Sequence, residues 1–197
     1  MSINAKQVKE LKDKTGIGLM ECKKALKETD GDMEAAIDIL RKRGLAKAEK
    51  KSGRDVKEGR IYSYIHPGGK IGVLVEINCE TDFVAKTDDF KEFAKNIAMH
   101  IAASDPLAVS RDEIDEEIVE KEKEIFAEQA KENNKPEKII PRIVEGKINK
   151  YFEQNCLMEQ SYVKDPDISV KEYVKQTIAK IGENMEIARF TRYKLGE

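Results

Sequence analysis

The sequence predicts an α+β protein in which a three-helix bundle precedes a small antiparallel sheet with packed helices and a helical hairpin. Three observations predict this class. Residues 5–44 contain three segments with the apolar spacing of amphipathic helices. From Gly59 the apolar period changes to two, and Pro67-Gly68-Gly69 joins two strand-like runs as in a hairpin. Later segments return to helical spacing without the strand–helix–strand rhythm of a parallel sheet.

The composition is that of a charge-rich soluble protein. The chain has 197 residues, of which 38% are charged and 40% hydrophobic, and this length suits one domain plus a small module. No apolar run approaches the roughly 18–20 residues needed to span a bilayer. The opening residues MSINAKQVKE show neither the apolar core of a secretion signal nor the character of a transit peptide. We therefore expect a cytoplasmic protein that has no membrane association.

The three cysteines, Cys22, Cys79 and Cys156, lie far apart and outside any CxxC motif. An odd, scattered set of this kind indicates reduced thiols rather than a disulfide framework or a zinc site. We expect neither a bound metal nor a cofactor.

Charge is unevenly distributed along the chain. The net charge is −2, yet the residues through Lys57 hold 15 Lys and Arg against 10 Asp and Glu. A basic front and an acidic remainder suggest a partner that contacts both parts. Ordinary surface variation in a charge-rich chain is the simpler explanation.

The front module, residues 1–45, is predicted to contain three helices. Asn4 can cap the first helix and Gly16 can end it. The third helix is expected to begin after Asp32 and to end at Gly44. The inward stripes of the first and third helices are Ala5, Val8 and Leu11, and then Met33, Ala36, Ile37 and Leu40.

The second helix carries one apolar residue on its basic side. Met20 falls opposite the predicted inner face, in a lysine-rich surface that includes Lys23. Methionine is an adaptable contact residue on such surfaces, although packing against a neighbouring segment explains its position equally well. The predicted inner face consists of Leu19, Cys22, Ala25 and Leu26.

Residues 46–58 are charged and poor in large apolar side chains, so we interpret them as a helical or extended linker to a core at 59–197. In the core, the second strand is expected to alternate with Ile71, Val73, Val75 and Ile77 on one face. A helix over 88–104 should follow, capped by Asp88 or Asp89, and its inner residues are Phe90, Phe93, Ile97 and Ile101.

Residues 112–155 are predicted to form an antiparallel helical hairpin, because two apolar seams flank a short polar turn. The first seam is expected at Ile114, Ile118, Ile125 and Gln129, and the second at Ile140, Ile143, Val144, Ile148, Tyr151 and Phe152. The tail then reads as a capped helix from SVKE (169–172) to Gly182, followed by a final strand.

Phe83 is the most unusual residue of the core sequence. It follows the second strand directly and is surrounded by acidic residues, among them Glu80, Asp82 and Asp88. A large aromatic side chain in such surroundings either turns back into the core or faces outward for a partner.

Signatures of enzymes are missing from the chain. HPGGKI lacks the first glycine and the hydroxyl residue of a phosphate-binding loop. The only histidines are His66 and His100, and a pairing of Cys79 with His66 has no recognisable local signature. Two classes remain. A nucleic-acid or ribosome-binding protein should show clustered basic residues with stacking aromatics, whereas a protein-interaction factor should show small apolar anchors in polar surroundings.

Three stretches resemble the elongation factor Ts family. They are LKDKTGIGLMECKKAL (11–26), YIHPGGKIGVLVEINCETDFVAK (64–86) and VEGKINKYFEQNCLMEQSYVKD (144–165). Two mild departures are Glu21, where the family usually has Asp, and Leu19, where it has one of two paired methionines. The resemblance implies a ubiquitin-associated type of front module, a coiled-coil hairpin and a short form with one core subdomain.

The resemblance also implies a function and a site. Members promote the release of GDP from elongation factor Tu, without binding nucleotide themselves, without covalent chemistry and without direct contact to nucleic acid. By position, Asp82 and Phe83 match the family's TDF residues, which insert near the partner's Mg²⁺ site. The short form is expected to be a homodimer. The other residues that the resemblance assigns to partner binding are Leu11, Met20, Lys23 and His66.

Overall fold

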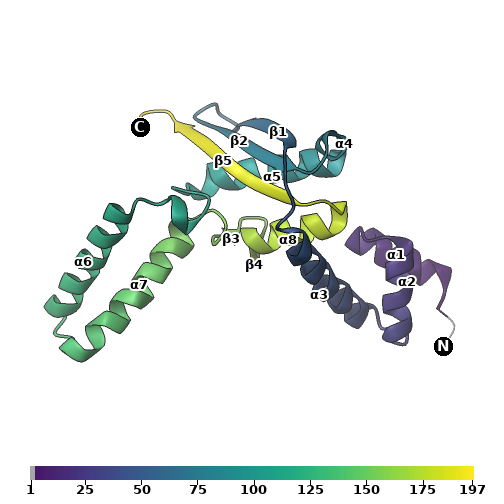
Figure 1. Ribbon diagram of the computed structural model, residues 1–197, viewed down its shortest axis with the longest axis horizontal. Coiled ribbons are helices and arrows are strands. Elements are labelled where there is room, and N and C mark those ends of the chain that lie inside the picture. Colours follow the sequence, from purple (N-terminus) through teal and green to yellow (C-terminus); the bar gives the residue numbers. More distant parts are fainter. Residues whose placement is uncertain (1–2) are drawn as a thin grey trace. The chain divides into compact units, whose positions relative to one another are not determined.

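The computed structural model describes residues 3–197, and Figure 1 shows the helices and strands in chain order. The described chain forms two compact units. The first unit comprises the chain up to Arg60, Ile77–Phe93 and Glu172–Glu186. The second unit comprises Ile61–Glu76, Ala94–Lys171 and Ile187–Glu197. The predicted α+β class is confirmed.

The front of the first unit is the predicted three-helix bundle. Its helices are α1 (Ala5–Thr15), α2 (Leu19–Glu28) and α3 (Met33–Lys51). The predicted caps are present, since Asn4 forms a capping box with Gln7 and Gly16 ends α1 with a φ of 68°. The buried core of the bundle consists of Val8, Leu11, Cys22, Ala25, Leu26, Ala36 and Leu40.

Two expectations for the bundle were wrong. Gly44 does not end the third helix, because α3 continues to Lys51. A Cβ atom at Gly44 would lie 2.9 Å from the Cβ of Ala179, so glycine here permits close packing of α3 against α8 (Val170–Ile181). Leu19 does not point inward either. It is the first residue of α2 and is 50% exposed, because the bundle core lies beside the later turns of that helix.

The larger sheet contains β1 (Glu58–Ile65), β2 (Ile71–Cys79) and β5 (Met185–Lys194) in the order β1-β2-β5, and it is antiparallel. The turn between β1 and β2 uses the two glycines at positive φ, 96° at Gly68 and 69° at Gly69. The alternation predicted for β2 is confirmed, since Val73, Val75 and Ile77 are buried while Leu74 is 48% exposed.

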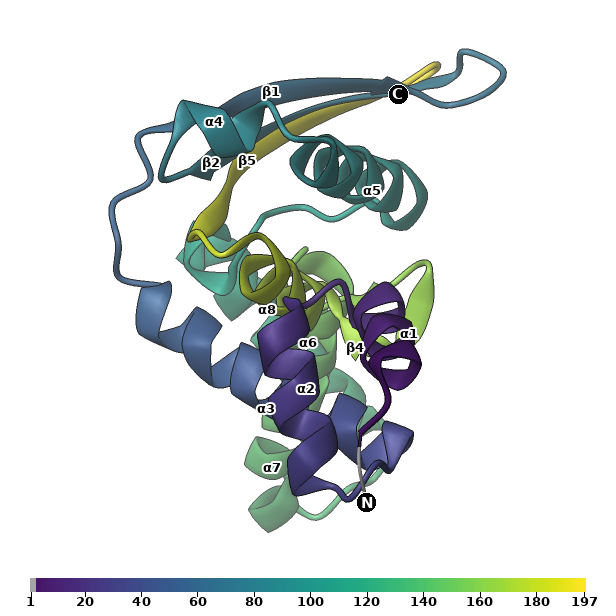
Figure 2. The same ribbon diagram turned by 90° about the vertical axis from the view of Figure 1, so that its right-hand side faces the viewer.

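Helix α5 (Asp88–Ser104) carries the predicted inner face of Phe90, Phe93, Ile97 and Ile101, all of them buried. Within the second unit, the end of this helix and the strands lie as two layers (Figure 2). The predicted cap was wrong. Thr87 caps the helix, because its Oγ1 accepts the backbone N–H of Phe90 at 3.3 Å.

The helical hairpin is confirmed as α6 (Glu116–Glu132) and α7 (Ile140–Asn155), which pack along each other (Figure 1). Short 3₁₀ turns at Arg111–Glu113 and Glu137–Ile139 precede these helices. The seam predicted for the first helix was right only at Ile114, which is buried at the end of the 3₁₀ turn before α6. Ile118 and Ile125 are 47% and 36% exposed, and the buried position of α6 is Ala130 instead. A single apolar stripe on a charged helix does not determine which of its sides packs against the neighbouring helix.

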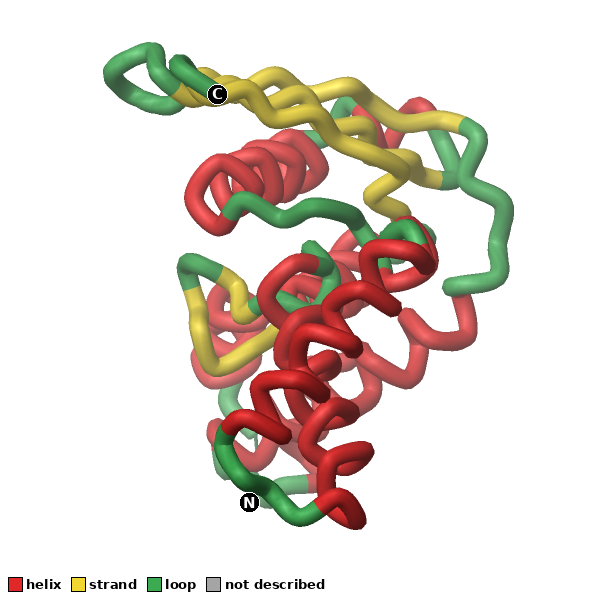
Figure 3. The backbone as a smooth tube through the Cα atoms, turned by 90° about the vertical axis from the view of Figure 1, so that its left-hand side faces the viewer, coloured by secondary structure: helices red, strands yellow, loops and turns green. Residues whose placement is uncertain are grey.

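A second sheet was not predicted. Its strands are β3 (Ser161–Tyr162) and β4 (Asp165–Ser169), which pair antiparallel. Figure 3 shows them apart from the larger sheet. Strands this short carry too few residues for a period of two to be recognised in the sequence.

A buried polar network crosses the second unit around His100, which has no exposed surface. The Nδ1 atom of His100 accepts the backbone N–H of Val163 at 3.2 Å, so Nε2 carries the proton and donates to Gln160 Oε1 at 2.9 Å. The Nε2 of Gln160 in turn donates to the carbonyls of Gln154 and Ser104, at 2.6 and 3.3 Å. Burial lowers the pKa of His100.

Candidate partner-binding site

Phe83 faces outward. Its side chain is 79% exposed, which is the highest value among the large apolar side chains of residues 3–197. It lies on α4 (Asp82–Ala85), a helix of one turn between β2 and α5. Ala85, two positions later and on the opposite side of the turn, is buried. The short helix therefore anchors itself through Ala85 and displays Phe83.

Asp82 and Lys86 form an ion pair beside this ring. The Nζ of Lys86 lies 2.5 Å from Asp82 Oδ2 and 5.9 Å from the centre of the Phe83 ring. The hydrogen bond from Lys86 lowers the pKa of the Asp82 carboxyl, so this group stays ionised at neutral pH. The exposed apolar ring is thus surrounded by charged groups, which keep such a surface soluble.

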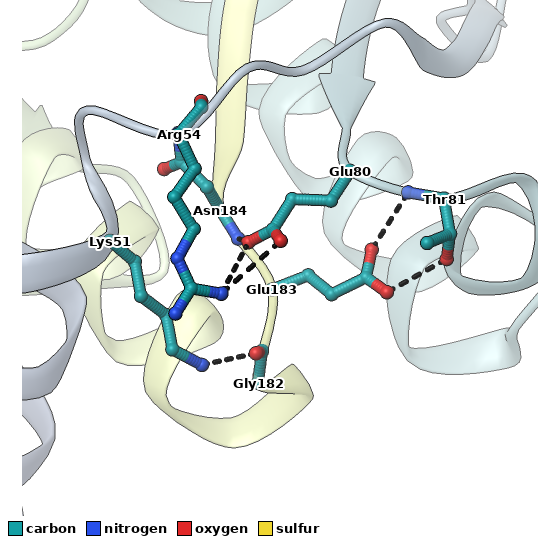
Figure 4. A network of polar contacts seen from close by, with 7 residues as sticks. All are labelled: Lys51, Arg54, Glu80, Thr81, Gly182, Glu183 and Asn184. Carbon is teal, nitrogen blue, oxygen red and sulfur yellow. Dashed lines mark hydrogen bonds and ion pairs between the residues drawn. The ribbon is translucent and has the colours of Figure 1, made fainter.

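Two carboxylates attach the base of α4 to the loop after α8 (Figure 4). Glu183 accepts the backbone N–H of Thr81 at 3.0 Å and the Thr81 hydroxyl at 2.7 Å. In the reverse direction, Glu80 accepts the backbone N–H of Asn184 at 2.6 Å. The attachment is therefore reciprocal: a carboxylate of each segment accepts hydrogen bonds from the other segment.

The same network includes the end of α3. Arg54 Nη1 donates to Glu80 at 3.2 Å, and the Asn184 side chain donates to the Arg54 carbonyl at 2.9 Å. Lys51 donates to the carbonyl of Gly182. The Asn184 N–H, with a smaller contribution from Arg54, lowers the pKa of Glu80. Sequence reasoning missed these partners, because the segments that they join are far apart in the chain and none carries a local motif.

The structure separates the other predicted site residues into three environments. Met20 and Lys23 lie on α2 and are exposed, Met20 to 67%. Helices α2 and α4 both belong to the first unit. Leu11 has no exposed surface and packs in the bundle core. His66 is exposed in the second unit, where its Nδ1 lies 3.1 Å from the hydroxyl of Tyr64. Leu19, next to Met20, adds an exposed apolar side chain that the sequence analysis had placed inside.

Three further properties of the described residues bear on function: metal ligation, membrane-spanning helices and the cysteine thiols. Between residues 3 and 197, no group of three His, Cys, Asp or Glu side chains is arranged to hold a metal ion. Nor does that part of the chain contain a helix with the length and apolarity to traverse a bilayer. Burial raises the pKa of the Cys79 thiol and raises that of Cys156 to about 11, so both are poor nucleophiles at neutral pH.

Comparison with known proteins identifies the family. Residues 4–197 match the sequence model of a family described as Elongation factor TS. A relative named Elongation factor Ts from Geobacter sulfurreducens is 59% identical over 197 residues, which is 100% of this chain and 91% of the relative. Relatives of the same name from Fervidobacterium nodosum and Desulfosudis oleivorans are each 55% identical, over 100% of this chain and 100% and 99% of their own lengths. Since the match extends through both units, the chain belongs to the elongation factor Ts family.

Proposed function

We propose that this protein is a cytoplasmic translation elongation factor that promotes the release of GDP from elongation factor Tu by inserting Asp82 and Phe83 near the partner's Mg²⁺ and nucleotide site. The observation that carries the proposal is the 79% exposure of Phe83 on an anchored turn of helix. Family membership supplies the partner.

Insertion of Phe83 accelerates the release of GDP only if the partner buries more of the ring in its nucleotide-free state than in its GDP-bound state. Burial of a fully exposed Phe side chain contributes roughly 2–3 kcal/mol. A preference of that size for the nucleotide-free partner corresponds to a bias of about 30- to 150-fold. By linkage, GDP must weaken the binding of this protein to its partner by the same factor.

Asp82 acts beside the ring. Its carboxylate hydrogen-bonds or repels groups near the partner's Mg²⁺ site, and its pairing with Lys86 must open when it does so. The exposed ion pair costs little to break, because exposed pairs contribute at most about 1 kcal/mol. Asp82 and Phe83 therefore work as one insertion.

The front module supplies a second contact in this proposal. Met20 and Lys23 on α2 dock on the partner's nucleotide domain, and Leu11 supports them from the bundle core rather than by direct contact. His66 adds a contact from the second unit. We also propose that residues 46–58 act as the linker between the module at 1–45 and the core at 59–197.

A second copy of the chain is the proposed partner for one face of the larger sheet. Five large side chains of the second unit are exposed there or next to it, which leaves an uncovered apolar surface: Ile61, Ile65, Leu74, Tyr193 and Leu195. Ile65 lies across Gly72 of the neighbouring strand, since a Cβ at Gly72 would be 3.1 Å from Ile65 Cδ1. Two-fold pairing would cover such a face, as is common among symmetric dimers.

The direct test is the release of fluorescent GDP from purified elongation factor Tu, with and without this protein. We expect release to accelerate at catalytic amounts of the protein, and GDP itself not to bind the isolated chain in equilibrium dialysis. Unchanged release together with salt-sensitive binding to RNA would favour the alternative, a nucleic-acid or ribosome-binding protein without exchange activity.

A further inference from the structure

We propose that Glu183 is a positioning residue for the insertion: its carboxylate fixes Thr81, and Thr81 fixes the turn that displays Phe83. This inference rests on the proposed exchange function, which it extends to a residue outside α4. Neither the front-module signature nor the segment around Phe83 includes Glu183.

The geometry around Thr81 shows how the effect is transmitted. The two carboxylate oxygens of Glu183 each accept one hydrogen bond from Thr81, one from its backbone N–H and one from its hydroxyl. With its proton directed to Glu183, the Thr81 Oγ1 presents lone pairs to the backbone N–H of Val84 at 3.4 Å. That contact is the N-cap of α4.

Helix α4 depends on this support because it is short. Its four residues form a single turn, and an isolated turn of helix is unstable in water. The ion pair between Asp82 and Lys86 is exposed and adds little. The cap at Thr81, the burial of Ala85 and the hydrogen bond from Cys79 Sγ to the Thr81 carbonyl therefore hold the turn that carries Phe83.

The reciprocal pairing makes the attachment rigid. One hydrogen bond would let the chain at 80–81 rotate, but Glu80 and Thr81 bond in opposite directions to Asn184 and Glu183. Asn184 is 5% exposed, so water competes little for this bond. Arg54 joins the same network from the segment that follows α3.

Loss of the Glu183 carboxylate should reduce the fraction of molecules in which the turn is ready to insert. If that fraction falls to about a tenth, binding to the nucleotide-free partner weakens about tenfold. In the order of events that we propose, the loaded partner binds before the insertion forms, so its affinity should not change. The predicted signature is a kcat for GDP release that is about tenfold lower, with a KM for loaded elongation factor Tu within about twofold of wild type.

The test compares Glu183→Ala with Glu186→Ala, a matched control. Glu186 is exposed, lies three residues further along and takes no part in the network. Besides kcat and KM, amide hydrogen exchange of residues 80–86 is followed in the free proteins. We expect faster exchange at 80–86 and a lower kcat in Glu183→Ala alone, with exchange in α5 unchanged. Glu183→Gln, which keeps the shape of the side chain, replaces the alanine variant if that variant unfolds.

The outcomes separate this inference from the proposed function. If wild-type protein fails to accelerate GDP release, the proposed function is wrong, and hydrogen exchange alone then decides whether Glu183 orders the turn. If wild type is active while Glu183→Ala matches it in kcat and in hydrogen exchange, only the positioning role is overturned. A fall in kcat with a matching global loss of protection would assign Glu183 to general stability and would likewise overturn the role.

Discussion

At the scale of single residues, the same side chain has opposite roles a few positions apart. Phe83 is 79% exposed, whereas Phe90 and Phe93 are 0% and 1% exposed. The two core rings stabilise the fold through burial, whereas Phe83 buries so little surface that we expect it to contribute almost nothing. An exposed aromatic residue that is held in an ordered turn, without benefit to stability, indicates a contact surface.

Phe83→Ala and Phe90→Ala form a matched pair that tests this division. Truncation of Phe90 should cost about 3–5 kcal/mol of unfolding free energy, because it leaves a cavity. Phe83→Ala should change stability by less than about 0.5 kcal/mol and should slow GDP release from elongation factor Tu. Urea unfolding and stopped-flow GDP release on both variants give the answer. A strongly destabilised Phe83→Ala with normal release per folded molecule would return Phe83 to the core.

Addition of Asp82→Ala tests whether the two residues act as one insertion. We expect Asp82→Ala to slow release in the same direction, and the double variant to be less impaired than the two single effects combined. Stopped-flow GDP release on wild type, both single variants and the double variant completes the cycle. Strictly additive effects would show that the two side chains act independently.

His100 predicts a pH dependence of stability. Burial lowers its pKa in the folded state below the unfolded value near 6.5, so the unfolded chain takes up the proton first. Stability contributed by neutral His100 is therefore complete above about pH 6.5 and is lost as the pH falls toward the folded-state pKa. The slope is at most about 1.4 kcal/mol per pH unit.

Urea unfolding between pH 7.5 and 5.5 measures this slope. His100→Gln should reduce the slope of stability against pH. The control is His66→Gln, which removes the other histidine of the chain, an exposed one, and should leave the slope as in wild type. An unchanged slope in His100→Gln would mean that other groups produce the dependence.

At the scale of elements, close approach of two helices shapes the first unit. Gly44 lies inside α3 where a side chain would meet Ala179 of α8. Gly146 also lies inside a helix, α7, but a Cβ there would have no heavy atom within 4 Å. The two glycines thus share a conformation and differ only in what surrounds them.

Alanine at each position should have opposite effects. Gly146→Ala should raise the unfolding free energy by about 0.5–1 kcal/mol, because alanine favours the helix and restricts the unfolded chain. Gly44→Ala carries the same gain but forces a contact of 2.9 Å with a Cβ that cannot move away, so a net loss is expected. Thermal unfolding of both variants tests this pair. Equal stabilisation by the two would show that α3 and α8 can separate without cost.

At the scale of the whole molecule, the uncovered sheet face predicts self-association. In sedimentation velocity the wild-type protein should have twice the chain mass of 22.4 kDa. Leu74→Asp should give the monomer, since it places a charge in the proposed interface. Leu107→Asp is the control, because Leu107 is 62% exposed in the second unit but lies outside the larger sheet. A wild-type monomer at working concentration would contradict the dimer.

The sequence by itself determined most elements and the family. These elements carry local signals, which local sterics and burial translate directly into structure. The signals are the period-two alternation in β2, the glycines at the turn and helix ends, and the apolar stripes on α1, α3, α5 and α7. Phe83 could be singled out in this way because a large ring among acids is unusual. Whether its ring points inward or outward could not be predicted, because a helix of four residues is compatible with both orientations.

Only the tertiary structure determined which residues of distant segments contact one another. Leu19 is exposed because the bundle core lies beyond the first turn of α2, and Ile118 is exposed because α7 meets another side of α6. Glu183 and Thr81 are 102 residues apart, so no spacing in the sequence relates them. Periodicity describes what one segment can bury or expose. Packing between segments selects which of those faces is covered, and here it leaves Phe83 outside.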